Sequence, residues 1–339
     1  MKRETTDRSA PMHRRAALLA ALGLPAAALL AAGPGQSFAQ SGAWPARPIK
    51  LIAPSAPGGA TDTVGRMLSR HLEKSLGQSI VVEAKPGAGT IIGVESVKNA
   101  APDGYTLLIS GSSTHSANPY LYAKLPYDPG KDFQDVGMVG FIPAIGLVRA
   151  SLGVRTTAEL IAYAKKNPGR LNYGYATSSS QVPPALLMAR AQIETVGVAY
   201  KSLSQIITDL AAGTIDYAFL DIMSAAPALQ NKAIVPFATT SQQRATTLPD
   251  VAPVADVLPG YEVRSWIGIA TPAGTPDGVI DKLNIALGAA LKDASTRQAL
   301  ERLGMTVQAF SRSEMASFAK ADRQRWAEWV RLAKIEPIQ

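Results

Sequence analysis

The feature that most constrains this chain is a regular alternation of strand-like and helix-like segments, which begins near residue 49 and continues past residue 220. Short runs rich in Ile, Val, Leu and Tyr occur at 49–55, 79–85, 104–111, 170–176, 195–200 and 215–221. Runs with helical periodicity separate them, at 63–76, 90–100, 156–169, 183–192 and 202–213. Strands that alternate with helices of this length form parallel sheets covered by helices. The pattern therefore predicts an α/β fold.

The rest of the chain suggests two domains without a tether between them. The length of 339 residues fits about two domains of roughly 150 residues each. A long apolar run at 136–150 is expected to cross between the domains. Two more strands are expected at 233–240 and 263–272, and mostly helix from 276 to 334. No internal repeat and no low-complexity linker is visible, so short crossovers should join the domains.

The first 39 residues have the composition of a secretory signal. Two adjacent arginines precede a moderately apolar Ala/Leu run, and Ser37 and Ala39 form a small-x-small cleavage site. We expect export, by the general secretory or the twin-arginine route, and cleavage near Ala39. Met12 is an alternative start to Met1, because the remaining segment is still a complete signal. A membrane anchor is the alternative reading of the run, and Pro25 disfavours it.

Charge and composition exclude several classes of function. The formal net charge is +8, and residues 1–39 hold five basic and two acidic residues, which leaves +8 − 3 = +5 for the mature chain. This suits an anionic solute, but no Lys/Arg block is interleaved with aromatic residues, so nucleic acid is not expected. The chain has no cysteine, which excludes disulfides and thiol nucleophiles. Few histidines and no tight carboxylate cluster predict no metal and no cofactor.

A strand, a Pro/Gly loop and a helix start follow one another in "PSAPGGATD", residues 54–62. Ligands of parallel sheets bind beyond the carboxyl ends of the strands, where loops meet helix N-termini. Gly58 and Gly59 allow the backbone to turn sharply and to approach a ligand. The start of the helix adds partial positive charge, so a carboxylate is the ligand that this loop favours. A capped turn without a ligand is the alternative. The candidate contacts are Ser55, Ala56, Gly58, Gly59, Thr61 and Asp62.

Two further loops follow strands in the first half. "SGSSTHSANP", residues 110–119, supplies Ser112, Ser113 and Thr114, with His115 beside them. A hydrolase could use a Ser/His pair, but no G-x-S-x-G motif occurs, and hydrogen bonding to a ligand or within the loop is preferred. "KPGAGTIIG", residues 85–93, has its glycines one residue too far apart for a dinucleotide fingerprint, so a structural turn that could line a cleft is preferred.

The second half repeats the logic of the opening loop. "YATSSSQVPP", residues 175–184, lies after a strand and before a helix that Pro183 and Pro184 are expected to start. Two anion sites at helix starts, one in each domain, would bind a small anion between them. The candidate contacts are Thr177, Ser178, Ser179 and Ser180.

Asp221 follows the strand-like run "IDYAFL", at the end of the strand where ligands bind. An ionised carboxylate that faces an anion site must meet a hydrogen-bond donor. Asp221 either caps a helix that begins near Ser224, or receives an ammonium, amide or hydroxyl group of the solute.

Several long segments together resemble one family. "WPARPIKLIAPSAPGGATDTVGRMLSRHL", "GQSIVVEAKPGAGTIIGVESV", "APDGYTLLIS", "TLPDVAPVADVLPGYEV" and "WIGIATPAGTP" are similar, in this order, to the Bug-type extracytoplasmic solute receptors of tripartite tricarboxylate transporters. The resemblance extends over about residues 44–336 and includes the Pro-Gly-Gly-x-Thr-Asp pattern of the opening loop.

This resemblance implies a periplasmic binding protein with a type 2-like fold, in which two α/β domains enclose a cleft. The chain would cross between domains near 139–147 and near 259–264, which gives one domain of 44–140 plus 264–339 and another of 141–263. A small carboxylate would be held by backbone amides and ordered waters, and passed to the permease subunits of a membrane transporter. A monomer is expected.

The sequence departs from the family pattern in the second domain. The segment 177–183 replaces the glycines and the histidine usual there, Tyr200-Lys201-Ser202 stands for Tyr-Lys-Gly, and Phe219-Leu220-Asp221 for Phe-Asp-Asn. The solute is therefore left open: a small organic carboxylate, an amino acid or an aromatic amide-acid. A secreted hydrolase or isomerase on the same fold, and a receptor that feeds a signalling partner, are the alternative functions.

Overall fold

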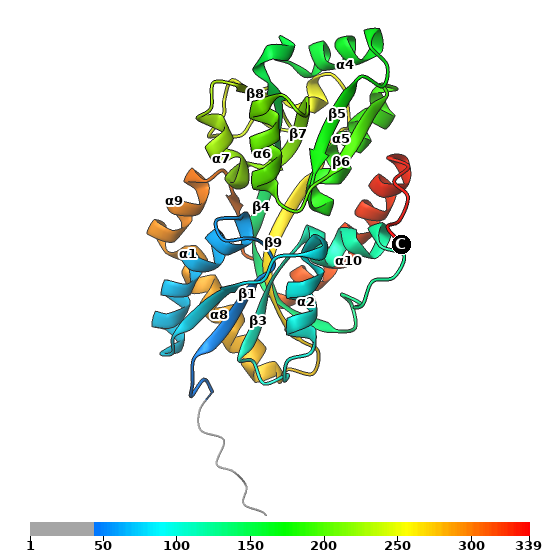
Figure 1. The fold of residues 1–339 in the computed structure, drawn as a ribbon. Coiled ribbons are helices and arrows are strands. Elements are labelled where there is room, and N and C mark those ends of the chain that lie inside the picture. Colours follow the sequence, from blue (N-terminus) through cyan, green and yellow to red (C-terminus); the bar gives the residue numbers. More distant parts are fainter. Residues whose placement is uncertain (1–43) are drawn as a thin grey trace, which may run out of the picture. The chain divides into compact units, whose positions relative to one another are not determined.

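The computed structural model describes residues 44–339, and within them the predicted alternation of strands and helices is confirmed (Figure 1). The predicted signal segment 1–39, its cleavage near Ala39, its export route and the choice between Met1 and Met12 lie outside the described residues.

The strands are β1 (Ile49–Ala53), β2 (Ile80–Ala84), β3 (Thr106–Gly111), β4 (Phe133–Arg149), β5 (Leu171–Tyr175), β6 (Thr195–Ala199), β7 (Tyr217–Asp221), β8 (Ile234–Thr239), β9 (Arg264–Pro272) and β10 (Thr306–Val307). The α-helices are α1 (Ala60–Leu76), α2 (Ile91–Lys98), α3 (Asn118–Leu121), α4 (Thr157–Lys166), α5 (Ser178–Ala191), α6 (Leu203–Ala212), α7 (Ile222–Leu229), α8 (Asp277–Lys292), α9 (Ala294–Arg302) and α10 (Arg312–Leu332). Short helical turns are η1 (Ala88–Thr90), η2 (Ser112–Ala117), η3 (Ala150–Leu152) and η4 (Val254–Asp256).

The sheet order is β2-β1-β3-β9-β4-β7-β5-β6, with β8 and β10 also paired to β4. At one end β1 is parallel to β2 and β3, and at the other end β5 is parallel to β6 and β7. The two connecting strands β4 and β9 are antiparallel to each other and to the strands beside them. The α/β class is confirmed. The sheet is mixed, because antiparallel strands connect its two parallel parts.

Strand β4 links the two ends of the sheet. Its first part, Phe133–Pro143, pairs with β9, and from Ala144 onward it pairs with β7. The change of partner falls between Pro143 and Ala144. Every residue from Val136 to Val148 is buried, which explains the long apolar run in the sequence. Figure 1 shows β4 and β9 running from the strands beside α1 and α8 to those beside α5, α6 and α7.

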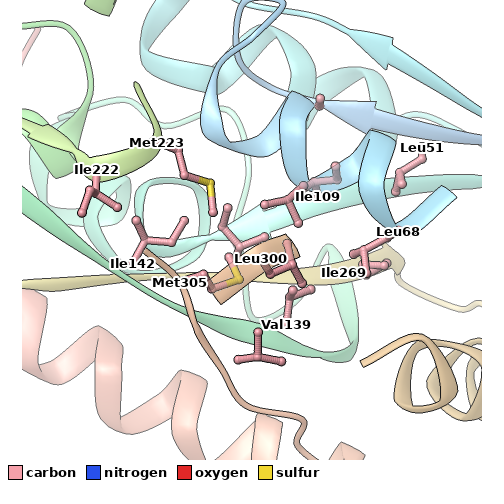
Figure 2. Packing of buried hydrophobic residues seen from close by; sticks show 14 of the residues in the cluster. Leu51, Leu68, Ile109, Val139, Ile142, Ile222, Met223, Ile269, Leu300 and Met305 are labelled. Carbon is pink, nitrogen blue, oxygen red and sulfur yellow. The ribbon is translucent and has the colours of Figure 1, made fainter. Parts of the chain in front are cut away.

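The core is built on both faces of the sheet. Alternate residues of β1 point to opposite faces, so that Leu51 packs with α1 and α8 while Ile52 packs with α2. The largest cluster continues along β4 into the second half of the chain, and Figure 2 shows Ile109 and Ile142 in it together with Met223 and Leu300. Each fully buried Leu or Ile contributes about 1.5–3 kcal/mol to stability.

Two local expectations were wrong. The segment after β3 is a wide helical turn, η2, which continues into α3, rather than an open loop. Helix α5 begins at Ser178, five residues before Pro183, so the two prolines lie inside the helix and do not start it. The start is fixed instead by Thr177, whose side chain and that of Ser180 form a capping box.

Within residues 44–339, no helix combines the length and the apolar character that a membrane crossing needs.

Candidate functional site

A cavity of about 430 Å³ lies at the carboxyl ends of the strands, and residues that follow each of the six parallel strands line it. Its floor is apolar and comes from β3, β4 and β9, with Ile109, Ile142 and Ile267. Ile109 and Ile142 also belong to the large core cluster in Figure 2, so the cavity rests directly on the core. This is the position that the parallel-sheet rule predicts for a ligand.

Most of the side chains and backbone segments proposed from the sequence meet in this cavity. Those that line it are Ser55, Ala56, Gly58, Gly59, Thr61, Ser112, Ser113, Thr114, Thr177, Ser179 and Asp221. Three do not line it: Asp62, Ser178 and Ser180. Contact with a solute stays a prediction for all of them.

The opening loop is held from behind by Asp62. Its carboxylate accepts the Gly58 amide at 2.9 Å and pairs with Arg66 of α1 at 2.9 Å. Burial alone would raise the pKa of Asp62, but the hydrogen bonds from Arg66 and the Gly58 amide outweigh it and hold the pKa below its usual value. Asp62 is therefore a structural acid that stays ionised and fixes the loop.

The two glycines of this loop have different roles. Gly58 has φ +80°, a conformation that favours glycine, while Gly59 has no room for a side chain because a Cβ would lie 2.8 Å from Ser55 Oγ. The Gly58 amide donates to Asp62, and the Gly59 amide donates to the Ala56 carbonyl at 3.0 Å.

Free amides occur in the first turn of α1, which follows the opening loop. Those of Ala60 and Thr61 donate to no acceptor among residues 44–339, and both residues line the cavity. Because the first N–H groups of a helix have no partner within it, these two amides are ready to hold an anion.

The segment after β3 is fixed by its own hydroxyl groups. Thr114 Oγ1 accepts the Gly111 amide at 2.9 Å, and Ser112 Oγ accepts the Trp266 amide at 2.8 Å. His115 is buried between Phe133 and Trp266, and its Nδ1 lies 2.9 Å from Thr114 Oγ1. Burial lowers the pKa of His115 to about 3. A neutral histidine that bonds within its own segment and does not line the cavity is structural.

The start of α5 meets this segment across the sheet. Ser113 Oγ donates to Ser179 Oγ at 3.3 Å, and Ser178 Oγ donates to Asn118 Oδ1. Ser180 Oγ accepts the amides of Ala176 and Thr177, each at 3.0 Å. Ser178 therefore joins α5 to the segment that follows β3, and Ser180 helps to cap α5. Thr177 and Ser179 line the cavity.

Asp221 ends β7 and begins α7. Its Oδ1 accepts the Ser224 amide at 2.8 Å, so the capping role proposed for it is present. The residue also lines the cavity, which leaves a second role open. Burial raises the pKa of Asp221 above its usual value, although hydrogen bonds from Ser224 and neighbouring amides act against this.

Several lining residues were not foreseen from the sequence. They form an apolar wall from α6 and α7, whereas the turn 86–90, which the glycine-rich segment predicted could line a cleft, lines another side. Leu203 and Ile207 on α6, with Met223 and Pro227 on α7, form that wall. No sequence motif marks these four residues. The sequence indicated only that each of the two helices follows a parallel strand and so begins at the edge where ligands bind. Lys201, just before α6, adds a cation at the edge.

A second hollow, of about 440 Å³, runs along α6 between Ala199 and Asp209. It involves a single strand–helix connection, and Tyr200 and Asp209 close part of it with a hydrogen bond of 2.8 Å. It does not gather loops from different strands, so it is the weaker candidate. Within residues 44–339 no group of three or more His, Asp or Glu side chains is placed to hold a metal ion.

Comparison with known proteins adds independent information. A family model described as "tripartite tricarboxylate transporter family receptor" matches residues 64–334. The chain is similar to the periplasmic binding protein BugD, with 30% identity, coverage of 87% of this chain and 100% of BugD, and a TM-score of 0.81.

Two similar structures contain a solute. Rpa4515 of R. palustris, solved with adipate, is 30% identical, with coverage of 87% of this chain and 100% of that chain and a TM-score of 0.83. MatC from Rhodopseudomonas palustris, solved with bound malate, is 32% identical, with coverage of 85% and 100% and a TM-score of 0.78.

Proposed function

This chain belongs to the tripartite tricarboxylate transporter receptor family, and we propose that it captures a small carboxylate-bearing solute in the cavity at the ends of its parallel strands. The observation that carries the proposal is the pair of free amides of Ala60 and Thr61, which face the cavity at the start of α1. They place hydrogen-bond donors and the positive end of a helix where an anion can bind.

The start of α5 offers a further donor for a carboxylate. Ser179, in the first turn of α5, lines the cavity, and its amide donates to no acceptor among the described residues. A hydrogen bond to a charged group contributes about 1.5–3 kcal/mol, so a few such donors suffice for tight binding. The similar proteins solved with adipate and malate support a carboxylate as the solute class. The apolar floor and wall leave room for a hydrocarbon body.

The proposed contacts are the opening loop, the segment Ser112–Thr114, Thr177 with Ser179, and Asp221. We also propose the domain bounds 44–140 plus 264–339 and 141–263. The change of partner of β4 at Pro143–Ala144 and the start of β9 at Arg264 support these bounds. A solute that contacts both domains would stabilise their closed arrangement.

The biological setting follows from the family. We propose a periplasmic monomer, exported with cleavage near Ala39, that delivers its solute to the permease subunits of a tripartite tricarboxylate transporter. The finer choice of solute includes an organic acid, an amino acid and an aromatic amide-acid. The proposal treats the protein as a receptor and not as an enzyme, because the cavity lining offers Lys201 and Asp221 but no histidine.

The test uses residues 40–339, purified without denaturation. Native mass spectrometry should reveal a retained organic acid, and calorimetry with a panel of mono-, di-, hydroxy-, amino and aromatic carboxylates should find at least one that binds stoichiometrically. Proton NMR of the same mixtures should show no conversion. Conversion would favour the hydrolase or isomerase alternative. Absence of both a retained acid and any binding at millimolar concentration would overturn the receptor proposal.

A further inference from the structure

Two charged side chains line the cavity, and they have opposite signs. Of the lining residues, Lys201 and Asp221 are the ones that carry charge. Lys201 is exposed and also borders the outer hollow along α6, so it lies at the rim, where solvent screens it. Asp221 is partly buried at the end of β7, opposite Ala144 in the register with β4. The charge in the interior of the cavity is therefore the acid.

Asp221 accepts hydrogen bonds from neighbouring groups of the protein but has no cationic partner among the described residues. Its Oδ1 accepts the Ser224 amide at 2.8 Å, yet no Lys, Arg or His within residues 44–339 lies close enough to form an ion pair with it. Nearby, Ser224 Oγ is buried and has no hydrogen-bond partner among the described residues. Both groups line the cavity. A carboxylate that is partly removed from water and has no cation gains from a further donor, and the cavity beside Asp221 allows a solute to supply one.

Asp221 caps α7 as well as Asn or Ser would, but the cap does not require its charge. A helix cap needs one acceptor oxygen, and Asn or Ser supplies it without a charge. Asp adds a negative charge to a cavity that otherwise presents amides for an anion. A second carboxylate of the solute would meet this charge with repulsion, whereas an ammonium, amide or hydroxyl group would be attracted to it.

We infer that Asp221, with Ser224 beside it, selects solutes that carry a hydrogen-bond donor, above all an ammonium group, in addition to the carboxylate held at the helix starts. The inference rests on the proposed receptor function and narrows its solute class to acids that also carry a donor, with amino acids ahead of amide-acids and hydroxy acids. Plain dicarboxylates are the class it rejects.

The test compares matched acids that differ in one group. One series is succinate, 4-aminobutanoate, succinamate and butanoate, a second is its six-carbon counterpart, and a third pairs leucine with 4-methylpentanoate. Calorimetry measures each with the wild type and with Asp221→Asn and Asp221→Ser, which keep a capping oxygen and remove the charge. Lys201→Gln is the matched change of the other cavity charge.

In at least one series the wild type should bind the amino acid roughly tenfold or more tightly than the dicarboxylate and the plain acid. Both Asp221 variants should lose most of that preference and gain affinity for the dicarboxylate. Lys201→Gln should weaken acids of all kinds and keep the preference for the amino group. If a variant melts early, the wild-type ranking still decides.

The outcomes separate the two proposals. Dicarboxylates or plain acids that bind the wild type as tightly as the amino acids would overturn the selection by Asp221 and leave the receptor intact. A preference for the amino group that survives in both Asp221 variants would also overturn it. If no acid of any series or of the wider carboxylate panel binds, the receptor function fails, and the inference fails with it.

Discussion

At the scale of single residues, a substitution at Gly59 tests whether the opening loop binds the solute. A side chain there would meet Ser55 Oγ at 2.8 Å and the Ala56 carbonyl at 3.1 Å, so Gly59→Val must displace the loop that precedes the Ala60 and Thr61 amides. Loss of two charged hydrogen bonds, at about 1.5–3 kcal/mol each, should weaken binding of the best acid roughly a hundredfold or more. Calorimetry measures the affinity, and circular dichroism shows whether the variant is folded.

Gly77→Ala provides the control for Gly59→Val, because it strains the other end of the same helix. Gly77 has φ +70° and no atom near the position of a Cβ, so alanine there costs stability through the backbone alone, by about 1 kcal/mol. Its melting temperature should fall while its affinity stays at the wild-type value. Unchanged affinity in a folded Gly59→Val protein would remove the opening loop from the site.

The ionisation of Asp135 should make the stability of the protein depend on pH. It is partly buried on β4, and its Oδ1 has no hydrogen-bond partner among the described residues. Burial raises its pKa to about 6, against the opposing effect of Arg323. Because the pKa is higher in the folded state, its ionisation lowers the stability as the pH rises through about 6.

Asp135→Asn removes this ionisation. The free energy of unfolding should rise by roughly 1–3 kcal/mol at about pH 7.5 and change little at about pH 3.5, below the pKa of the unfolded state, as measured by urea denaturation. The variant still contains His115, whose lowered pKa makes stability fall as the pH drops below its ordinary value, so the comparison with the wild type isolates Asp135. An equal change in stability at both pH values would contradict the prediction.

At the scale of elements, what the sequence could predict depended on how local the signal was. The alternation of strands and helices identified the six parallel strands and the helices α1, α2, α4, α5 and α6 between them. Thr156, whose side chain caps α4, lies at the start of one of these predicted helices. The start of α5 was missed because Pro183 was taken as a helix start, whereas the capping box of Thr177 and Ser180 begins the helix earlier. The turn η2 was missed because a run of Ser, Thr and Asn has no strong preference of its own.

Helix α10 shows a long-range arrangement that no local pattern reveals. Its first half packs Met315 and Ala319 against Trp266 and Phe141, while Trp326 belongs to the cluster formed with α5, β5 and β7. Between them, Asp322 accepts the Trp266 Nε1 hydrogen at 2.8 Å. In Figure 1, α10 extends from beside β9 towards the side on which α5 lies. The helix therefore ties together elements from both ends of the sheet.

Trp326→Ala should destabilise the protein through this helix. Trp326 is fully buried, so its truncation should lower the free energy of unfolding by about 3–5 kcal/mol. Leu332→Ala, at the exposed end of the same helix, is the control and should cost well under 1 kcal/mol, because its side chain keeps 37% of its exposure. Chemical denaturation measures both. Similar losses in the two variants would mean that the second half of α10 is not part of the core.

At the scale of the whole molecule, the sequence indicated the site only in part. Ligand-site reasoning from single strands identified the loops after β1, β3, β5 and β7. It could not show that the loop after β6 and the turn 86–90 converge with them, because convergence depends on the order of strands in the sheet. Nor could it separate Ser178, which faces Asn118, from Ser179, which faces the cavity, since a helix start can be rotated either way.

The contacts between the start of α5 and the segment formed by η2 and the first residue of α3, called the seam here, predict how the molecule responds to its solute. Two hydroxyl contacts, Ser113–Ser179 and Ser178–Asn118, join segments that follow strands from opposite ends of the sheet. If the two ends bend about β4 and β9, the solute should favour the arrangement in which this seam is formed. Small-angle scattering should then give a smaller radius of gyration at saturation with the best acid than without it.

Ser178→Ala distinguishes closure from direct contact, because Ser178 does not line the cavity. Loss of its bond to Asn118 should destabilise the closed arrangement by about 1 kcal/mol and weaken binding roughly fivefold. The radius of gyration at saturation should stay that of the wild type, since enough solute restores closure. Ser96→Ala, whose hydroxyl donates to Gly93 within α2, is the control and should keep full affinity. A radius of gyration that does not change when the wild type is saturated would show that the cavity binds without closing, and the seam would then be a fixed part of the fold.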